Sequence, residues 1–391
     1  MVRRGSWSRA KRLTAGLLAA AGVLALPACG SSDGGGASTT AAPAAQTIAA
    51  ESQPAGDAAA LVADVRQPLD AFDGPSASPG PVPPDKKIAV IYPLPAPLPL
   101  RATAGVEEAA KAVGWSVTKI DGRGTPEGYV NAVEKAISQK VDGIVLVAMP
   151  VPLLQAQIEK ASAAGIPTTA ILPSLPEEEA DPSDYGLVDV VDSNHSEQGT
   201  VLGNWVVADA PQGAKAIRLV SPEFPDLTRE SDEFAKALEA GGDGYEVVDV
   251  VESPVTDILG GPQGVQRLTA ALRKHPDVTH VFMLSESWSQ IFLQAKKTSG
   301  RDDLVGLGSD GDVTVPLVAD GEELVMIGPD TLSYGWYAVD SLIRAFNDEP
   351  AVGPYRPDSQ LVDTTNAQDV DGEGITAAYD FRSAWKQLWG V

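Results

Sequence analysis

The chain has little cysteine and little histidine. Its 391 residues include one cysteine, Cys29, and three histidines, His195, His275 and His280. A single cysteine excludes an internal disulfide framework and cysteine-rich zinc or iron–sulfur sites. The expected end of a helix and start of a strand separate His275 from His280, which is not metal-ligand spacing on one helix face. We therefore expect no metal ion and no cofactor.

Basic residues are few beside acidic ones. The chain has 29 Lys and Arg residues against 53 Asp and Glu residues, a formal net charge of -24. An acidic surface repels the phosphates of nucleic acids, so we expect no nucleic-acid partner. Hydrophobic residues make up 43% of the chain. This share is enough for a sizeable core, and the length suggests about two domains.

The hydrophobic segment near the N-terminus is short. Residues 13–26 are apolar, follow a basic stretch without acids, and are too short to span a bilayer comfortably. This order is typical of a secretory signal peptide. Residues 26–29, Leu-Pro-Ala-Cys, resemble a bacterial lipobox, although Pro27 is less usual there. We expect residues 1–28 to be removed and Cys29 to carry a lipid; the alternative is an ordinary signal peptide with an incidental cysteine.

The next segment has the composition of a linker. Residues 30–84 are rich in Gly, Ala, Ser and Pro. Such a segment buries too little apolar surface to offset its loss of chain entropy on folding. We expect residues 29–84 to form a flexible tether, in which residues 57–69 form a short helix on the folded body.

From residue 86 onward, strand and helix patterns alternate. The strands are short apolar runs without polar alternation, as in strands that are buried on both faces of a sheet. The alternation predicts parallel sheets with helices on both faces, and it restarts after residue 194, which indicates two doubly wound α/β lobes. The expected strands are residues 88–92, 116–120, 143–147, 166–171 and 188–191, then 216–220, 245–251, 279–284, 304–308 and 324–327.

Five short stretches follow one another along the body: KIAVI at residues 87–91, QKVDGIVLV at 139–147, AGIP at 164–167, HPDVTHVF at 275–282 and GSDG at 308–311. In this order they resemble the periplasmic sugar-binding proteins of the ribose-binding type, the type I substrate-binding components of ABC importers. The resemblance implies a three-segment hinge that crosses near Asn194, near Pro329 and within residues 350–360. It gives an N-terminal lobe of residues 85–193 plus 330–350. The C-terminal lobe then comprises residues 194–329 plus 351–391, with residues 381–388 packed on it as a helix.

Asp310 is the best candidate for a ligand contact. It ends an apolar strand, where the resemblance implies an Asp that accepts hydrogen bonds from a pair of sugar hydroxyls. The alternative is a turn Asp between Ser309 and Gly311. Aromatic side chains that stack on a sugar or clamp a cation are expected at Tyr92, Trp288 and Trp336. Each of these could instead seal a contact between the lobes.

Most of the family's other sugar-clamping groups are replaced. The first loop offers apolar side chains such as Leu98, Ser285 takes the place of an Asn or Asp, and Arg229 and Asp330 lie one residue from clamp positions. An unpaired buried polar group costs about 1–3 kcal/mol. The ligand is therefore expected to be less hydroxylated than a typical sugar, cationic or partly apolar.

The resemblance implies an exported solute-binding lipoprotein, not an enzyme. It would be a monomer on the outer face of the cytoplasmic membrane that delivers a sugar or sugar-like ligand to an ABC permease. Two alternatives stay open. One is a sensor subunit that presents ligand to a receptor kinase. The other is a hydrolase that uses the carboxylates of Asp310, Glu286 and Asp330.

Overall fold

The computed structural model describes residues 53–258, 262–370 and 374–391. The expected signal peptide, Cys29 and the first part of the expected tether lie outside these ranges. Among the helices of the described ranges, none has the length and hydrophobicity that a membrane span requires.

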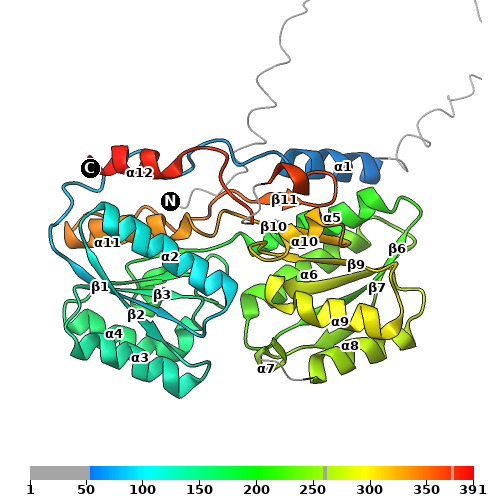
Figure 1. The fold of residues 1–391 in the computed structure, drawn as a ribbon, viewed down its shortest axis with the longest axis horizontal. Coiled ribbons are helices and arrows are strands. Elements are labelled where there is room, and N and C mark those ends of the chain that lie inside the picture. Colours follow the sequence, from blue (N-terminus) through cyan, green and yellow to red (C-terminus); the bar gives the residue numbers. More distant parts are fainter. Residues whose placement is uncertain (1–52, 259–261, 371–373) are drawn as a thin grey trace, which may run out of the picture. The chain divides into compact units, whose positions relative to one another are not determined.

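The first lobe is built on a five-stranded parallel sheet (Figure 1). Its order is β2 (Ser116–Asp121), β1 (Lys87–Tyr92), β3 (Gly143–Val147), β4 (Thr168–Ile171) and β5 (Asp189–Val191). In β1, Ile88 and Val90 enter one core while Ala89 and Ile91 enter the other, so an unbroken apolar run serves both faces. Helices α2 (Pro97–Ala112) and α11 (Tyr334–Phe346) cover one face, and α3 (Pro126–Ser138) and α4 (Gln155–Ala163) cover the other.

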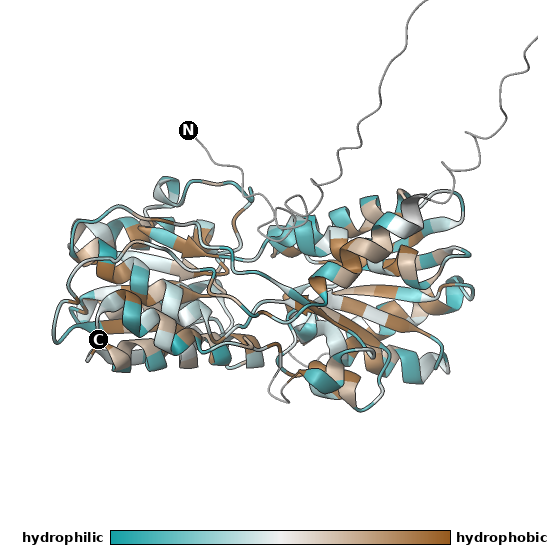
Figure 2. Ribbon diagram, turned by 90° about the horizontal axis from the view of Figure 1, so that it is seen from above, coloured by the Kyte–Doolittle hydropathy of each residue, from teal (hydrophilic) through white to brown (hydrophobic). Residues whose placement is uncertain are grey.

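The second lobe contains a six-stranded sheet. Its order is β11 (Gln360–Val362), β10 (Leu324–Gly328), β9 (Val305–Ser309), β8 (His280–Ser285), β6 (Ala214–Val220) and β7 (Tyr245–Glu252), with only β11 antiparallel to its neighbour. Helix α6 (Pro225–Glu239) lies on one face of this sheet, and α8 (Gln263–Lys274) and α9 (Ser289–Ser299) lie on the other (Figure 1). Figure 2 shows hydrophobic residues along the strands of both sheets. The expected fold class, two doubly wound α/β lobes, is confirmed.

A close helix contact in the second lobe positions part of the site. A Cβ atom on Gly199 of α5 (His195–Asp209) would lie 2.1 Å from the carbonyl oxygen of Glu230 on α6. No side chain larger than that of glycine fits there. The two helix backbones therefore approach closely enough for His195 and Glu230 to meet.

Three segments join the lobes: residues 192–194 after β5, residues 329–333 after β10, and the segment before β11. In the third, Tyr355 still pairs with Val191 beside β5. The expected packing of residues 381–388 on the second lobe was wrong. The C-terminal helix α12 (Phe381–Trp389) packs on the first lobe, where Trp385 and Trp389 join the core that contains α11. The aromatic residues of this helix show that it packs on the body but do not specify the surface that receives it.

The second half of the expected tether is not a free linker. Val62 and Val65 of α1 (Gln53–Val65) are buried in the core of the second lobe. Farther on, the Phe72 ring packs edge-on against Trp385 at 5.1 Å, and Pro83 accepts a hydrogen bond of 2.7 Å from Trp115 Nε1. Residues 56–84 thus contact both lobes; we call them the N-terminal strap. The prolines that made this segment look like a linker restrict its backbone φ angles, which suits an extended path along the surface.

Candidate functional site

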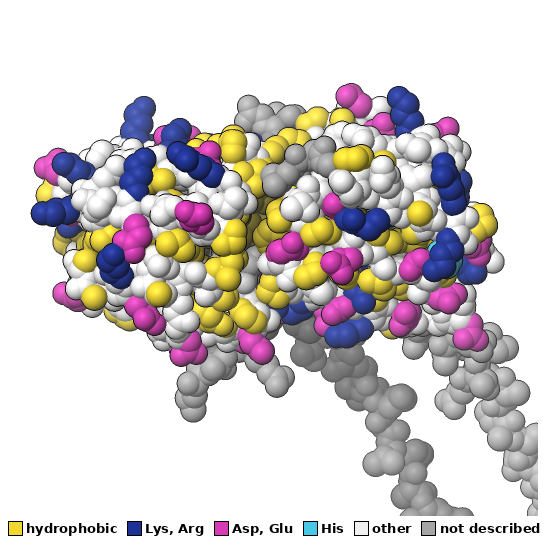
Figure 3. Space-filling view, turned by 90° about the horizontal axis from the view of Figure 1, so that it is seen from below, with side chains coloured by type: hydrophobic (Ala, Val, Ile, Leu, Met, Phe, Trp, Pro, Cys, Tyr) yellow, Lys and Arg dark blue, Asp and Glu magenta, His cyan; other side chains and the backbone are white. Residues whose placement is uncertain are grey.

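A cavity of about 660 Å³ lies between the two lobes. Its lining comes from the segments that follow all five strands of the first sheet and β6, β7, β8 and β9 of the second. Figure 3 shows apolar side chains gathered along the crease between the lobes. Ligands of doubly wound sheets bind beyond the carboxyl ends of the strands, so this cavity is the candidate binding site.

Unusual backbone conformations gather around the cavity. Four lining residues other than glycine have a positive φ: Ala148 (49°), Leu172 (49°), Ser174 (47°) and Asp310 (66°). Side chains with a Cβ atom rarely adopt this left-handed region, and such strain concentrates at functional sites. At Asp310 the backbone N–H still donates to the Ile327 carbonyl, at 2.9 Å, which fixes the turn beyond β9.

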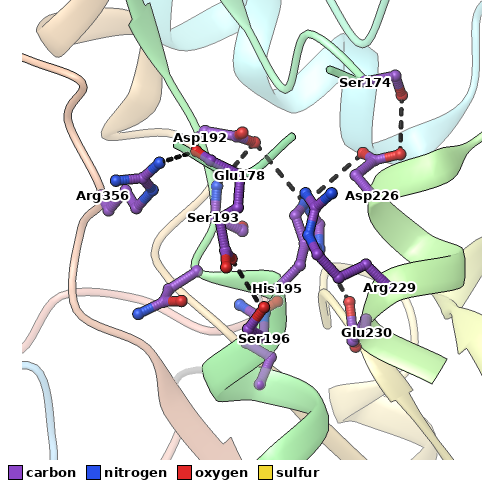
Figure 4. Close-up of polar contacts among 12 residues, drawn as sticks. Ser174, Glu178, Asp192, Ser193, His195, Ser196, Asp226, Arg229, Glu230 and Arg356 are labelled. Carbon is purple, nitrogen blue, oxygen red and sulfur yellow. Dashed lines mark hydrogen bonds and ion pairs between the residues drawn. The ribbon is translucent and has the colours of Figure 1, made fainter. Parts of the chain in front are cut away.

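His195 is the centre of a buried polar cluster (Figure 4). Its Nδ1 lies 2.9 Å from Glu230 Oε2, and its Nε2 lies 3.6 Å from Asp226 Oδ2 and 3.7 Å from Asp192 Oδ1. Burial lowers the pKa of His195, but contact with these acids outweighs burial and raises that pKa well above its usual value. His195 is therefore an imidazolium ion that neutralises part of the acidic cluster.

A second group of acids surrounds Asp310. Burial, followed by the nearby Glu286 and Asp312 carboxylates, raises the pKa of Asp310 well above its usual value. Burial also raises the pKa of Glu286 to about 8 and that of Asp312 to about 7. Arg101 Nε lies 2.9 Å from Asp312 Oδ1 and is the nearby guanidinium. Some of these carboxyl groups therefore hold protons at neutral pH.

Polar contacts join the lobes beside the cavity. Ser174 Oγ donates to Asp226 Oδ1 at 3.1 Å, from the first lobe to α6 of the second (Figure 4). Arg229 Nη1 donates to the Pro176 carbonyl at 3.0 Å in the same region. Contacts between side chains of opposite lobes depend on the angle between the lobes, so this cluster is coupled to the hinge.

Four side chains expected at the site line the cavity. Leu98 lies in the first turn of α2, which begins earlier than expected, and Ser285 ends β8. Trp288 and Asp310 complete the second-lobe wall, and Trp288 Nε1 donates to Ser253 Oγ at 2.9 Å. That any of them contacts a ligand stays a prediction.

The other four expected side chains are not among the lining residues. Arg229 donates a hydrogen bond to the Pro176 carbonyl instead. Asp330 accepts hydrogen bonds from the backbone N–H groups of Leu332 and Ala377 in the hinge region. Tyr92 packs half-buried on the first-lobe core. Trp336 is 1% exposed and stacks on Trp389, with ring centroids 5.3 Å apart. Residues 334–344 of α11 are all buried, so Trp336 faces the core of the first lobe although it lies near the start of its helix.

Sequence reasoning missed the His195 cluster and Phe224, the aromatic partner of Trp288 in the cavity wall. No motif marks Asp226 or Phe224, and His195 stands out in the sequence only because histidine is rare. The sequence does place these residues between a strand and a helix, since Phe224 precedes α6 and Pro225 and Asp226 begin it. Side chains that bind ligands often lie at such positions in doubly wound sheets. In the part of the chain that the structure describes, no set of three or more His, Cys, Asp or Glu side chains is arranged to hold a metal ion.

The fold and this cavity define a two-lobed binding protein, and comparison with known proteins gives its family. The model of a periplasmic binding protein domain matches residues 98–350. The chain therefore belongs to the periplasmic binding protein family. The ribose import binding protein RbsB of Bacillus subtilis (strain 168) is 25% identical over 214 residues, which cover 53% of this chain and 64% of that protein. The match thus spans less than two thirds of that relative.

Solved structures show the same fold. An ABC sugar transporter subunit from Rhodobacter sphaeroides 2.4.1 superimposes with a TM-score of 0.61 at 21% identity, covering 72% of this chain and 99% of that one. An ABC transporter solute-binding protein from Mycobacterium smegmatis, with bound glycerol, gives a TM-score of 0.64 at 22% identity, covering 75% and 100%. These similarities support the two-lobed architecture.

Proposed function

We propose that the protein is an extracytoplasmic solute-binding protein that captures a small ligand between its lobes and delivers it to an ABC permease. The observation that carries this proposal is the cavity of about 660 Å³ formed by strand ends of both sheets. The names of the relatives, a ribose import protein and a sugar transporter subunit, support a sugar or sugar-like ligand. Asp310 would orient that ligand through its unpaired carboxyl oxygens.

The hinge supplies the mechanism of capture. Three segments join the lobes, and a ligand that contacts both walls favours the arrangement in which the lobes are close. Release at the permease then requires the lobes to separate. The surface of each lobe beside the cavity mouth would carry the permease contacts.

Export and anchoring follow from the N-terminus. We propose that residues 1–28 are a signal peptide and that Cys29 carries the lipid that holds a monomer on the outer face of the membrane. The strongly acidic composition agrees with a protein that binds no nucleic acid. Replacement of Cys29 by Ser should release the protein from the membrane fraction into the medium or periplasm.

The geometry favours binding over catalysis. Of the carboxylates that a hydrolase would need, Asp330 is held by hinge N–H groups, and Glu286 accepts a hydrogen bond of 2.8 Å from Val313 N without lining the cavity. The sensor alternative shares the binding step and differs only in the partner. Co-purification with a permease, or with a receptor kinase, separates these two roles.

The binding step is tested by titration of the purified protein with ribose, tagatose and glycerol, followed by thermal unfolding and small-angle X-ray scattering. A bound ligand should raise the melting temperature by mass action and reduce the radius of gyration. Asp310→Asn should weaken the shift. If sugars, polyols and amines all leave both quantities unchanged, the protein is not a solute-binding protein of this kind.

A further inference from the structure

Apart from His195, the polar side chains that line the cavity are carboxyl groups and hydroxyls. The carboxylates are Glu223, Asp226 and Asp310, and the hydroxyls are those of serine, threonine and tyrosine. No Lys, Arg, Asn or Gln side chain is among the described lining residues. A sugar needs donors as well as acceptors because each of its hydroxyls does both. The lining therefore suits a ligand whose polar part mainly donates.

The positive groups near the cavity are already matched by acids. His195 lies among Asp192, Asp226 and Glu230, and Arg101 pairs with Asp312. Within the described part of the chain, the Asp310 carboxyl makes no side-chain hydrogen bond or ion pair. The charge of His195 lowers the pKa of Asp310, but burial and the neighbouring acids outweigh it. A cationic ligand would therefore supply the direct ion pair that Asp310 lacks, and burial would make that attraction strong.

A second, independent feature is the apolar rest of the wall. Prolines and leucines from the first lobe, with Leu98 among them, face Phe224, Ile258 and Trp288 of the second lobe. The Phe224 and Trp288 rings meet edge to face, 6.2 Å apart. Such a surface is stabilised by covering a hydrocarbon or aromatic body, and its apolar side chains form no hydrogen bonds with sugar hydroxyls.

We infer that the ligand is an amphipathic amine, with its ammonium group at Asp310 and its apolar body between Leu98 and the Phe224–Trp288 wall. This inference rests on the proposed function and names the ligand class for the same site. An ammonium group has three donors and no acceptor, which matches a lining rich in acceptors. The raised pKa of Asp310 agrees with a carboxyl that lacks its cation in the empty protein.

The test compares ligands that differ only in the polar group: phenethylamine, 2-phenylethanol and phenylacetate, with ribose as the hydroxylated reference. Affinities are measured by titration calorimetry at pH 7.5 on the purified protein. Phenethylamine should bind at least about tenfold more tightly than 2-phenylethanol, and phenylacetate most weakly. Runs in phosphate and Tris buffers should show that the amine, and not the alcohol, releases protons as Asp310 ionises.

Asp310→Asn keeps the size of the side chain, and asparagine tolerates the left-handed backbone, so the variant should fold. It should bind phenethylamine no better than 2-phenylethanol, while the control Asp302→Asn, at an exposed loop, keeps the preference. Binding of ribose without any preference for the amine overturns the inference but upholds the solute-binding function. Failure of every probe and every sugar overturns both.

Discussion

Buried charge dominates the site at the scale of single residues. The Glu286 residue is 2% exposed, one of its carboxyl oxygens has no hydrogen-bond partner among the described residues, and the Asp312 carboxylate adds to the effect of burial. The pKa of Glu286 is about 8 in the folded protein against an ordinary value of 4.5. The folded state therefore holds a proton that the unfolded state loses, and stability must fall as the pH rises from about 5 to about 8.

Glu286→Gln should remove much of this pH dependence, because glutamine keeps the acceptor for the Val313 N–H and carries no titratable proton. Between pH 5 and pH 8, the unfolding free energy of the variant should fall by on the order of 2 kcal/mol less than that of the wild type. Urea unfolding at both pH values measures it. Parallel pH profiles for the wild type and the variant would contradict the assignment.

His195 is the residue whose removal should be most costly in the cluster. His195→Gln leaves Glu230, which is 0% exposed, with no cation beside it, and we expect a loss of about 3 kcal/mol at pH 7. The double variant His195→Gln/Glu230→Gln should regain part of that loss. The control is His275→Gln, where the partly exposed pair with Asp249 is worth no more than about 1 kcal/mol.

At the scale of elements, the sequence predicted most of the sheet-and-helix order because each strand and helix has its own period. The expected strand of residues 143–147 is β3, and the expected strand of residues 88–92 falls within β1. What local pattern cannot provide is the surface on which an outlying element docks. For this reason α12 was assigned to the wrong lobe and Trp336 to the cavity, and the His195 cluster, which needs three separate segments to meet, was missed.

The docked terminal elements form one packing unit with the first lobe. Trp385 of α12 is 0% exposed and contacts Phe72 of the N-terminal strap and Tyr337 of α11, with ring centroids 5.1 and 4.8 Å away. Trp385→Ala should lower the unfolding free energy by about 3–5 kcal/mol. Leu100→Ala, at a side chain 42% exposed on α2, should change it by less than about 0.5 kcal/mol. Equal effects in denaturant unfolding would show that the strap and α12 do not stabilise the lobe.

For the whole molecule, the strap is a fourth connection between the lobes. Arg66 Nε donates to Asp363 Oδ2 at 2.9 Å in the second lobe, while Arg344 Nη2 of the first lobe donates to the Ala77 carbonyl at 2.6 Å. Between these ends, Asp73 accepts hydrogen bonds from the Tyr337 hydroxyl and, at 2.8 Å, from the Asp358 N–H of the third crossover. A rotation of one lobe against the other must disturb these contacts, so the strap favours the arrangement seen here.

Asp73→Ala should therefore let the empty protein open further. In a Cys29→Ser background, dyes at Glu127→Cys beside the cavity wall of the first lobe and Gln266→Cys on α8 would report the separation of the lobes by single-molecule energy transfer. We expect a broader distribution with longer distances in the empty variant. The control Asp70→Ala, an exposed strap residue, should match the wild type. Apparent affinity falls with the population of the arrangement that binds ligand. If the variant populates this arrangement less, ligand should also dissociate faster from it. An unchanged distance distribution with unchanged dissociation would show that the three crossovers alone determine the angle between the lobes.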